Sequence, residues 1–152
     1  MTEVHRTALE ISFRHCDPAG IVFYPRYAEM INDVVEHWFK HGLGCDFATL
    51  HGPRAIAIPV VKLQIDFKNP GFLGETLEAG LVVSRLGTSS LSLDITMRGQ
   101  GAAQATDLKL VANLTVVFVD MGGKKAIEIP ADLRAALERY RSDERYELAR
   151  TP

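Results

Sequence analysis

A carboxylate lies just ahead of the chain's best amphipathic helix, in a loop whose other residues are small or apolar. Asp17 belongs to the run 16–27, which reads Cys-Asp-Pro-Ala-Gly-Ile-Val-Phe-Tyr-Pro-Arg-Tyr. The first backbone N–H groups of a helix lack partners within it, so they can hold a developing negative charge. A carboxylate and such amides in one loop are a minimal set for attacking a carbonyl group. The loop therefore indicates an enzyme.

The residues around Asp17 favour a binding site for another molecule. Pro18 biases Asp17 to an extended backbone, which sets the direction of its side chain. Ala19 and Gly20 leave room for a ligand to approach the backbone. An acyl pocket would then be walled by the apolar residues that follow, Ile21, Val22, Phe23 and Tyr24. The alternative for Asp17 is structural, because Asp commonly caps a turn or a helix.

Two neighbours of Asp17 offer weaker chemistry. Cys16 is a rival nucleophile, but an adjacent carboxylate disfavours its thiolate, so we interpret it as a buried structural cysteine. His15 lies beside the loop and is a candidate substrate contact, with a simple polar neighbour as the alternative.

A possible zinc site lies on the helix itself. His37 and His41 are four residues apart and Asp33 is one turn earlier, a spacing that can bind zinc. The glutamate that follows the first histidine of a hydrolytic zinc helix is missing, and no cysteine cluster completes the set. We interpret this stripe as a solvated helix face and expect no metal.

Composition describes one ordinary globular domain, residues 1–152, with 47% hydrophobic and 24% charged residues. A net charge of −2 gives no reason to expect nucleic acid or a membrane surface as a partner. Two cysteines, Cys16 and Cys45, form no disulfide framework and favour the cytoplasm. Phosphate contacts of a nucleotide-bearing substrate could come from several basic residues, among which the sequence does not choose: Arg54, Lys62, Lys68, Arg85, Arg98, Lys124 and Lys125.

Hydrophobic periodicity predicts a long helix over residues 26–41. Its apolar positions recur at i, i+3 and i+4 and are Tyr27, Met30, Ile31, Val34, Val35, Trp38 and Phe39. Pro25 suits the first helical turn, and Gly42 and Gly44 end the helix by adopting positive φ.

Period-two alternation predicts strands over residues 8–13, 61–67, 77–83, 91–97 and 108–119. In the first, Leu9, Ile11 and Phe13 share the buried side. Turns are expected at residues 69–71, 99–103 and 121–125, and a loop at residues 51–53. A short helix is expected over residues 131–141, and the charged tail from Ser142 is a candidate for disorder. Short turns between successive strands predict an antiparallel sheet. The α+β fold that satisfies all elements is such a sheet wrapped around helix 26–41, with edges that invite homo-oligomerisation.

The run from Asp17 to Tyr27 resembles the 4-hydroxybenzoyl-CoA thioesterase family of hotdog-fold proteins. Beyond these eleven residues the resemblance rests on element order, through Ile127–Pro130. It implies hydrolysis of an acyl-CoA thioester without metal or cofactor, with Asp17 as the catalytic carboxylate and the Tyr24 backbone N–H polarising the carbonyl. It also implies a homodimer or homotetramer with active sites at the subunit interface.

Substrate and route stay open. Arg14 and His15 stand where the hydroxybenzoyl enzyme has a smaller and an acidic residue, so that specificity is not transferred, and both aryl and short-chain acyl-CoA remain candidates. Asp17 acts either as nucleophile or as general base. The competing functions are a hydratase or dehydratase on the same fold and a non-catalytic binder of acyl thioesters.

Overall fold

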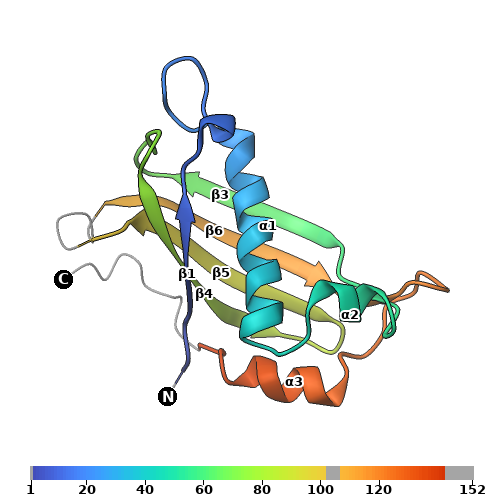
Figure 1. The fold of residues 1–152 in the computed structure, drawn as a ribbon. Coiled ribbons are helices and arrows are strands. Elements are labelled where there is room, and N and C mark those ends of the chain that lie inside the picture. Colours follow the sequence, from blue (N-terminus) through green and yellow to red (C-terminus); the bar gives the residue numbers. More distant parts are fainter. Residues whose placement is uncertain (1, 102–106, 143–152) are drawn as a thin grey trace.

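The computed structural model describes residues 2–101 and 107–142 of the chain (Figure 1). Four of its elements are helical: a 3₁₀ turn (Phe13–His15), α1 (Tyr24–His41), α2 (Phe47–His51) and α3 (Ala131–Glu138). Its strands are β1 (His5–Glu10), β2 (Ile56–Ala57), β3 (Val60–Phe67), β4 (Thr76–Leu86), β5 (Ser90–Gly99), β6 (Leu108–Val117) and β7 (Val119–Asp120).

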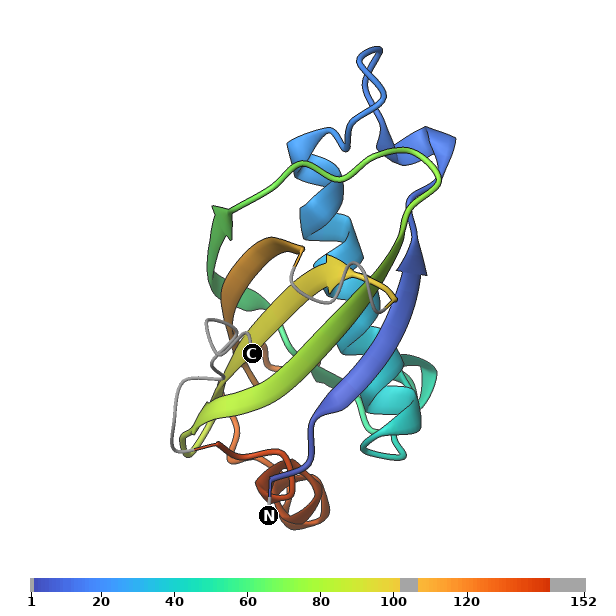
Figure 2. The same ribbon diagram turned by 90° about the vertical axis from the view of Figure 1, so that its left-hand side faces the viewer.

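The main sheet has five antiparallel strands in the order β1-β4-β5-β6-β3. It curves around α1, which lies in its concave face (Figures 1 and 2). Strands β2 and β7 form a separate two-stranded ribbon beside α2. The predicted α+β arrangement, an antiparallel sheet wrapped around one long helix, is confirmed.

Helix α1 supplies the centre of the core. Its buried residues are the seven predicted from periodicity: Tyr27, Met30, Ile31, Val34, Val35, Trp38 and Phe39. They pack against inward-facing residues of β4, β5 and β6 such as Leu81, Ile95 and Leu114. The helix begins at Tyr24, two residues before the predicted start, with Pro25 in its first turn.

The end of α1 differs from the prediction in its use of glycine. Gly42 has a φ of −93°, within the right-handed helical region, and only Gly44 has positive φ, at 71°. A side chain at residue 42 would meet Trp38 Cδ1 at 2.5 Å and the Tyr140 hydroxyl at 2.8 Å. Glycine is therefore required at residue 42 by close packing against Trp38 and Tyr140 rather than by its backbone conformation.

Strand β1 covers residues 5–10 rather than the predicted 8–13, because the chain turns immediately after Ile11. The Ser12 carbonyl accepts a hydrogen bond from the His15 N–H at 3.0 Å, which closes a 3₁₀ turn. This turn directs Phe13 outward, where it is 82% exposed, so its predicted place on the buried face is wrong. Local polar contacts here override the alternating pattern.

Strand β3 pairs with β6 and not with β4, its neighbour in sequence. Residues 69–71 are predicted from the sequence as a turn between adjacent strands. They belong instead to the segment over residues 68–75, hereafter the crossover. The crossover passes over the end of the sheet, next to the loop before α1 (Figures 1 and 2). Strand β3 is consequently an edge, and most of its apolar side chains, Val60, Val61, Leu63 and Phe67, are exposed.

Three other boundaries depart from the sequence-based expectation. Helix α2 replaces part of the predicted loop, because its five residues are too few to give a periodic signal in the sequence. Asp46 caps this helix by accepting a hydrogen bond from the Thr49 N–H at 2.8 Å. The last predicted strand divides into β6 and β7, and α3 ends at Glu138. Beyond α3, the Ser142 N–H donates a hydrogen bond to the Val83 carbonyl at 2.9 Å. The tail beyond it and residues 102–103 of the predicted turn lie outside the described residues.

The helix face expected to be solvated is partly covered. His41 is exposed, but His37 is half-buried and its Nδ1 lies 2.9 Å from Nε2 of the buried His5 on β1. Burial, followed by the charges of His37 and His41, lowers the pKa of His5 from 6.5 to about 4. The folded protein therefore keeps His5 neutral at neutral pH.

Acid should destabilise the protein through His5. Because its pKa is lower in the folded than in the unfolded state, its contribution is complete above pH 6.5 and is lost as the pH falls towards 4. We expect a loss of about 2 kcal/mol over this interval. Urea unfolding of the wild type and His5→Gln at pH 7 and pH 4.5 would measure it. Equal acid sensitivity of the two proteins would contradict the prediction.

Candidate functional site

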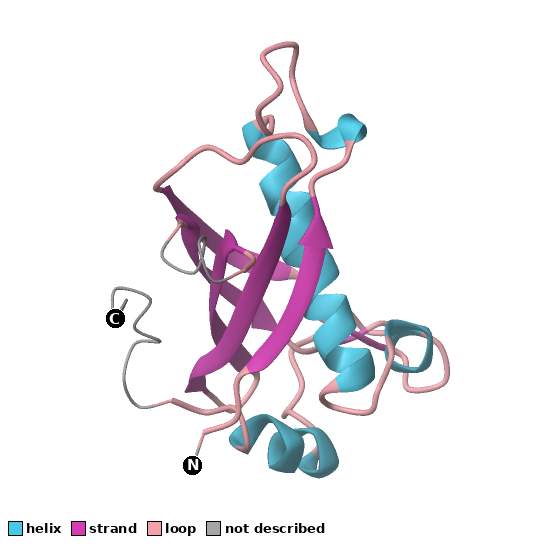
Figure 3. Ribbon diagram, turned by 60° about the vertical axis from the view of Figure 1, so that its left-hand side comes forward, coloured by secondary structure: helices cyan, strands magenta, loops and turns pink. Residues whose placement is uncertain are grey.

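The loop around Asp17 is a tight hairpin, hereafter the Asp17 hairpin (residues 16–22). Its ends form an antiparallel bridge between Cys16 and Val22. Within it the Asp17 N–H donates to the Ile21 carbonyl at 2.9 Å, and the Gly20 N–H donates to the Asp17 carbonyl at 3.0 Å. Gly20 has a φ of +78°, which glycine adopts without strain. The hairpin projects beyond the end of the sheet, over the head of α1 (Figures 1 and 3).

The Asp17 carboxylate is half-buried and only partly engaged. Its Oδ1 accepts a hydrogen bond from the Ala19 N–H at 2.9 Å, so Asp17 does cap its own turn, as the structural alternative predicted. Within the described part of the chain, its other oxygen has no hydrogen-bond partner. Asp17 lines a cleft of about 660 Å³ together with Phe13, Arg14, Cys16, Pro18, Gly20 and Leu73. One carboxylate oxygen is therefore available to a ligand in that cleft.

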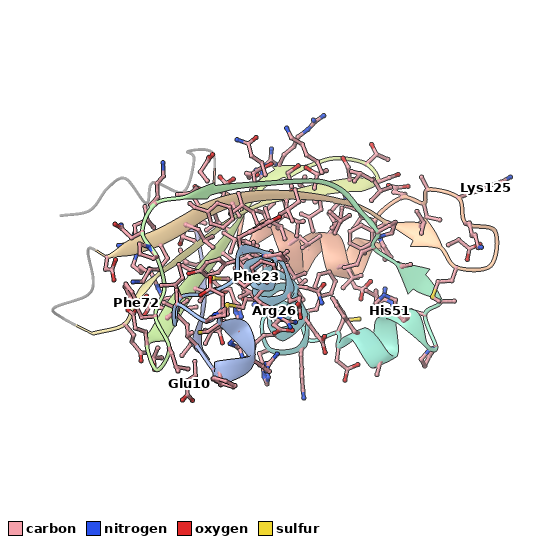
Figure 4. The ribbon with its side chains drawn as sticks, turned by 90° about the horizontal axis from the view of Figure 1, so that it is seen from above. Glu10, Phe23, Arg26, His51, Phe72 and Lys125 are labelled. Carbon is pink, nitrogen blue, oxygen red and sulfur yellow. The ribbon has the colours of Figure 1, made fainter. Side chains whose placement is uncertain are left out.

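The head of α1 has a free backbone donor. Its N-cap residue, Phe23, provides no side-chain acceptor, and the hydrogen bonds found among the described residues leave the Tyr24 N–H without one. Pro25 has no N–H. Seen from above, Phe23 and Arg26 lie over this end of the helix, far from His51 on α2 (Figure 4). An oxygen with partial negative charge is the group that such a helix end attracts.

The predicted site residues divide between two clefts that meet at the Asp17 hairpin. Asp17 and Gly20 line the first, whereas Ile21, Val22 and Tyr24 line a second, of about 300 Å³. The remaining walls of the second cleft are Tyr27, Phe67, Lys68, Asn69, Pro70 and Gly71. Phe23 lines neither cleft, and Val22 turns its side chain mainly into the core.

His15 braces the site. It is buried, its Nδ1 accepts a hydrogen bond from the Ser12 N–H at 2.9 Å, and its carbonyl accepts one from the Phe23 N–H at 2.9 Å. Because Nδ1 accepts the hydrogen bond from Ser12, the neutral ring carries its proton on Nε2, and burial, followed by the charges of Arg14 and Arg26, lowers the pKa of His15 and so favours this neutral form. These contacts tie the turn after β1 to the head of α1. Cys16 is only partly buried, less than predicted.

Sequence reasoning missed the crossover as part of the site. The Val22 N–H donates to the Gly71 carbonyl at 2.9 Å, the Leu73 N–H donates to the Gly20 carbonyl at 3.0 Å, and Ile21 forms an antiparallel bridge with Phe72. The crossover thus forms the second side of the Asp17 hairpin. Gly71 and Gly74 are the signals that its sequence offers: a side chain at residue 71 would collide with the Tyr27 hydroxyl, and Gly74 has a φ of +90°.

A third cavity, with mostly apolar walls, lies between α1, α2 and the beginning of β3. It measures about 580 Å³, and its walls include Asn32, Val35, Phe47, His51, Val60 and Leu114. Of the basic candidates, Lys68 lines the Tyr24 cleft and Lys124 this cavity, whereas Arg54 is committed to a bidentate pair with Asp132 at 2.8 Å.

Neither a metal centre nor a membrane span is found in residues 2–101 and 107–142. No group of three or more His, Cys, Asp or Glu side chains there is placed to hold a metal ion. None of the helices there has the length and hydropathy needed to cross a bilayer.

Comparison with known proteins shows the family to which this chain belongs. Residues 11–137 match the family model described as the Thioesterase-like superfamily. The chain belongs to this superfamily. Two curated relatives have related activities in their names. A 1,4-dihydroxy-2-naphthoyl-CoA hydrolase of Crocosphaera subtropica is 25% identical over 114 residues, 75% of this chain and 80% of the relative. The long-chain acyl-CoA thioesterase FadM of Escherichia coli is 26% identical over 135 residues, 88% and 96% of the two chains.

Solved structures share the superfamily fold. A 1,4-dihydroxy-2-naphthoyl-CoA thioesterase from Synechocystis superposes with a TM-score of 0.79 at 18% identity, covering 89% of this chain and 96% of its own. A 4-hydroxybenzoyl-CoA thioesterase mutant complexed with 4-hydroxybenzoyl-CoA gives 0.79 at 22% identity, covering 88% and 98%. The predicted hotdog thioesterase family is confirmed, and the names of the curated relatives support the predicted activity.

Replacing Gly71 should loosen the contact between crossover and helix. In Gly71→Ala the new methyl group would collide with the Tyr27 hydroxyl and lie 2.9 Å from Ile11 Cδ1. We expect a loss of about 1–3 kcal/mol in the free energy of unfolding, measured in urea. Gly122→Ala is the control, since its methyl would lie at an ordinary 3.5 Å from Asp120. Equal stabilities of the two variants would refute the packing argument.

Proposed function

We propose that this thioesterase-superfamily protein hydrolyses an aryl- or short-chain acyl-CoA thioester to the free acid and coenzyme A. The observation that carries the proposal is the free Tyr24 N–H at the uncapped head of α1, next to a hairpin that presents one unengaged oxygen of Asp17. The curated relatives named as CoA thioester hydrolases support the same substrate class.

In the proposed mechanism, the thioester carbonyl oxygen accepts a hydrogen bond from the Tyr24 N–H. The α1 dipole stabilises the negative charge that develops on this oxygen as the carbonyl carbon is attacked. Asp17 either attacks that carbon, forming a mixed anhydride that water then cleaves, or removes a proton from an attacking water. The C–S bond breaks and coenzyme A leaves as a thiolate. Oxygen-18 in the Asp17 carboxylate after one turnover in labelled water would identify the covalent route.

The competing functions have less support. A hydratase or dehydratase needs a histidine working with a carboxylate, whereas His15, the histidine next to the hairpin, uses Nδ1 on the Ser12 backbone. A non-catalytic binder would not need the unengaged oxygen of Asp17.

The unpaired cysteines, Cys16 and Cys45, are consistent with a cytoplasmic location, which we also propose.

We propose further that two chains pair along β3. This strand is an edge of the sheet, and Val60, Leu63 and Phe67 expose apolar surface on its inner side. An unpaired apolar edge of eight residues is a site for strand pairing with a second copy. A two-fold axis between the two β3 strands, perpendicular to the sheet, would make that pairing antiparallel and join the two sheets. A homodimer, or a tetramer of two such dimers, follows.

Antiparallel pairing would bring two separate features of the chain together. The Phe67 end of β3 contacts Tyr24, with ring centroids 6.5 Å apart, whereas its Val60 end lines the 580 Å³ cavity. These ends are roughly 23 Å apart in one chain. Across the axis, the Val60 end of one strand lies against the Phe67 end of the other. The cavity of one subunit would then receive the acyl group whose carbonyl rests on the partner's α1.

Asp17→Asn should abolish turnover and keep binding. Asparagine retains the shape of the side chain but removes the base and nucleophile, so we expect kcat to fall about 10²- to 10⁴-fold. Free-thiol release over a panel of aryl and aliphatic acyl-CoAs would measure this, with Asp33→Asn on the exposed face of α1 as the control. No hydrolysis of any substrate by the wild type, or full activity of Asp17→Asn, would contradict the proposal.

A charge on the apolar side of β3 should separate the subunits. Leu63→Lys places an ammonium group in the proposed interface, whereas Gln64→Lys places it on the opposite face of the same strand. We expect light scattering to give a monomer for the first and the wild-type mass for the second, with thiol release lost only in the first. A monomeric wild type at micromolar concentration would refute the dimer.

A further inference from the structure

A lysine is buried beneath the crossover. The Lys109 side chain, at the beginning of β6, is 2% exposed. Its Nζ lies 2.5 Å from Asp107 Oδ2 and 3.1 Å from Glu75 Oε2, and it donates to the Pro70 carbonyl at 3.0 Å. Burial of an ammonium group is costly unless such partners surround it. The mechanism proposed above does not use this group.

The lysine and its neighbours hold the crossover against β6. The Lys109 carbonyl accepts hydrogen bonds from the Lys68 and Asn69 N–H groups at 2.8 and 3.3 Å. Glu75 Oε1, which also faces Nζ, accepts one from the Phe72 N–H at 2.7 Å. These polar contacts join the crossover to β6, whereas the Ile11 N–H to Glu75 carbonyl bond at 2.8 Å and the Gly74 N–H to Ile11 carbonyl bond at 3.0 Å join it to the end of β1.

The crossover in turn sets the position of the Asp17 hairpin. It is joined to the hairpin by the Val22 N–H to Gly71 carbonyl bond and by the Leu73 N–H to Gly20 carbonyl bond. Leu73 lines the cleft that contains Asp17, and Gly71 lines the cleft at Tyr24. Movement of the crossover would therefore change both clefts together.

We propose that Lys109, with Glu75 and Asp107, is a positioning residue for the Asp17 hairpin. It neither lines the two clefts nor touches substrate; it fixes the crossover on which the hairpin is built. The role in catalysis rests on the proposed thioesterase function, whereas the role in placing the hairpin does not. A displacement of about 1 Å at a reacting group is sufficient to reduce turnover about 10²-fold.

Removing one partner of a buried ion pair is costly when the charge left behind stays buried. Here the two carboxylates left behind reach solvent, with 15% of the Glu75 side chain and 32% of the Asp107 side chain exposed, and Glu75 keeps the hydrogen bond from the Phe72 N–H. The cost in stability is therefore smaller than for fully buried carboxylates. Methionine has nearly the length of lysine, so Lys109→Met removes the bonds to Pro70, Glu75 and Asp107 while filling the same space. Lys109→Arg keeps the charge and the donors.

The test combines amide hydrogen exchange with steady-state kinetics in the full chain. In Lys109→Met we expect the Val22 and Leu73 amides to exchange at least about tenfold faster, while Ile95, central in β5, keeps its protection. We expect kcat to fall at least about tenfold with KM changed less than about twofold. Lys109→Arg should restore much of both, and Lys40→Met, at an exposed lysine in the last turn of α1, should alter neither.

Three outcomes would overturn the proposal. They are wild-type protection and kcat in Lys109→Met, faster exchange at Ile95 as well as at Val22 and Leu73, and no recovery in Lys109→Arg. If Lys109→Met does not fold, Glu75→Gln and Asp107→Asn each remove one charge without changing size and must shift the same two amides. Absence of hydrolysis by the wild type would overturn the proposed function instead, and the exchange pattern would still decide the role of Lys109.

Discussion

The packing of α1 inside the curved sheet is the constraint on which the other features depend. Seven large apolar residues on one side of the helix are buried, so its axis cannot shift or rotate without opening the core. The helix nevertheless begins at the open end of the sheet, with a free N–H at Tyr24 and no side-chain cap at Phe23. An unsatisfied donor that costs little in water becomes a binding group when a ligand excludes water there.

Apart from the 3₁₀ turn at Phe13–His15, the segments around this helix end have no regular secondary structure and are held by specific polar contacts. The Asp17 hairpin closes on its own backbone, His15 fastens the turn before it to Phe23, and the crossover closes it from the other side. Lys109 holds the crossover from beneath. A rigid helix end and a hairpin braced on two sides are the arrangement that positioning of a carboxylate against a carbonyl requires.

Much of the fold follows from hydrophobic periodicity, because α1 and the central strands bury whole faces. The same signal fails where polar contacts decide the backbone: Ser12 and His15 end β1 early, and Gly42 is selected by Trp38 rather than by φ. Asp17 and Tyr24 are candidate site residues on the basis of the loop and the family resemblance. The crossover is not, because the pairing of β3 with β6 depends on contacts between residues about 50 apart in the chain, and Lys109 looks like any strand lysine.

The central claim is that a thioester carbonyl binds at the head of α1 beside Asp17. A crystal structure of the Asp17→Asn protein with an unhydrolysed acyl-CoA tests it most directly. The account predicts the carbonyl oxygen within about 3 Å of the Tyr24 nitrogen, with the carbonyl carbon facing the side chain of residue 17. An acyl-CoA bound with its carbonyl away from Tyr24, for example wholly within the cavity beside α2, would contradict it.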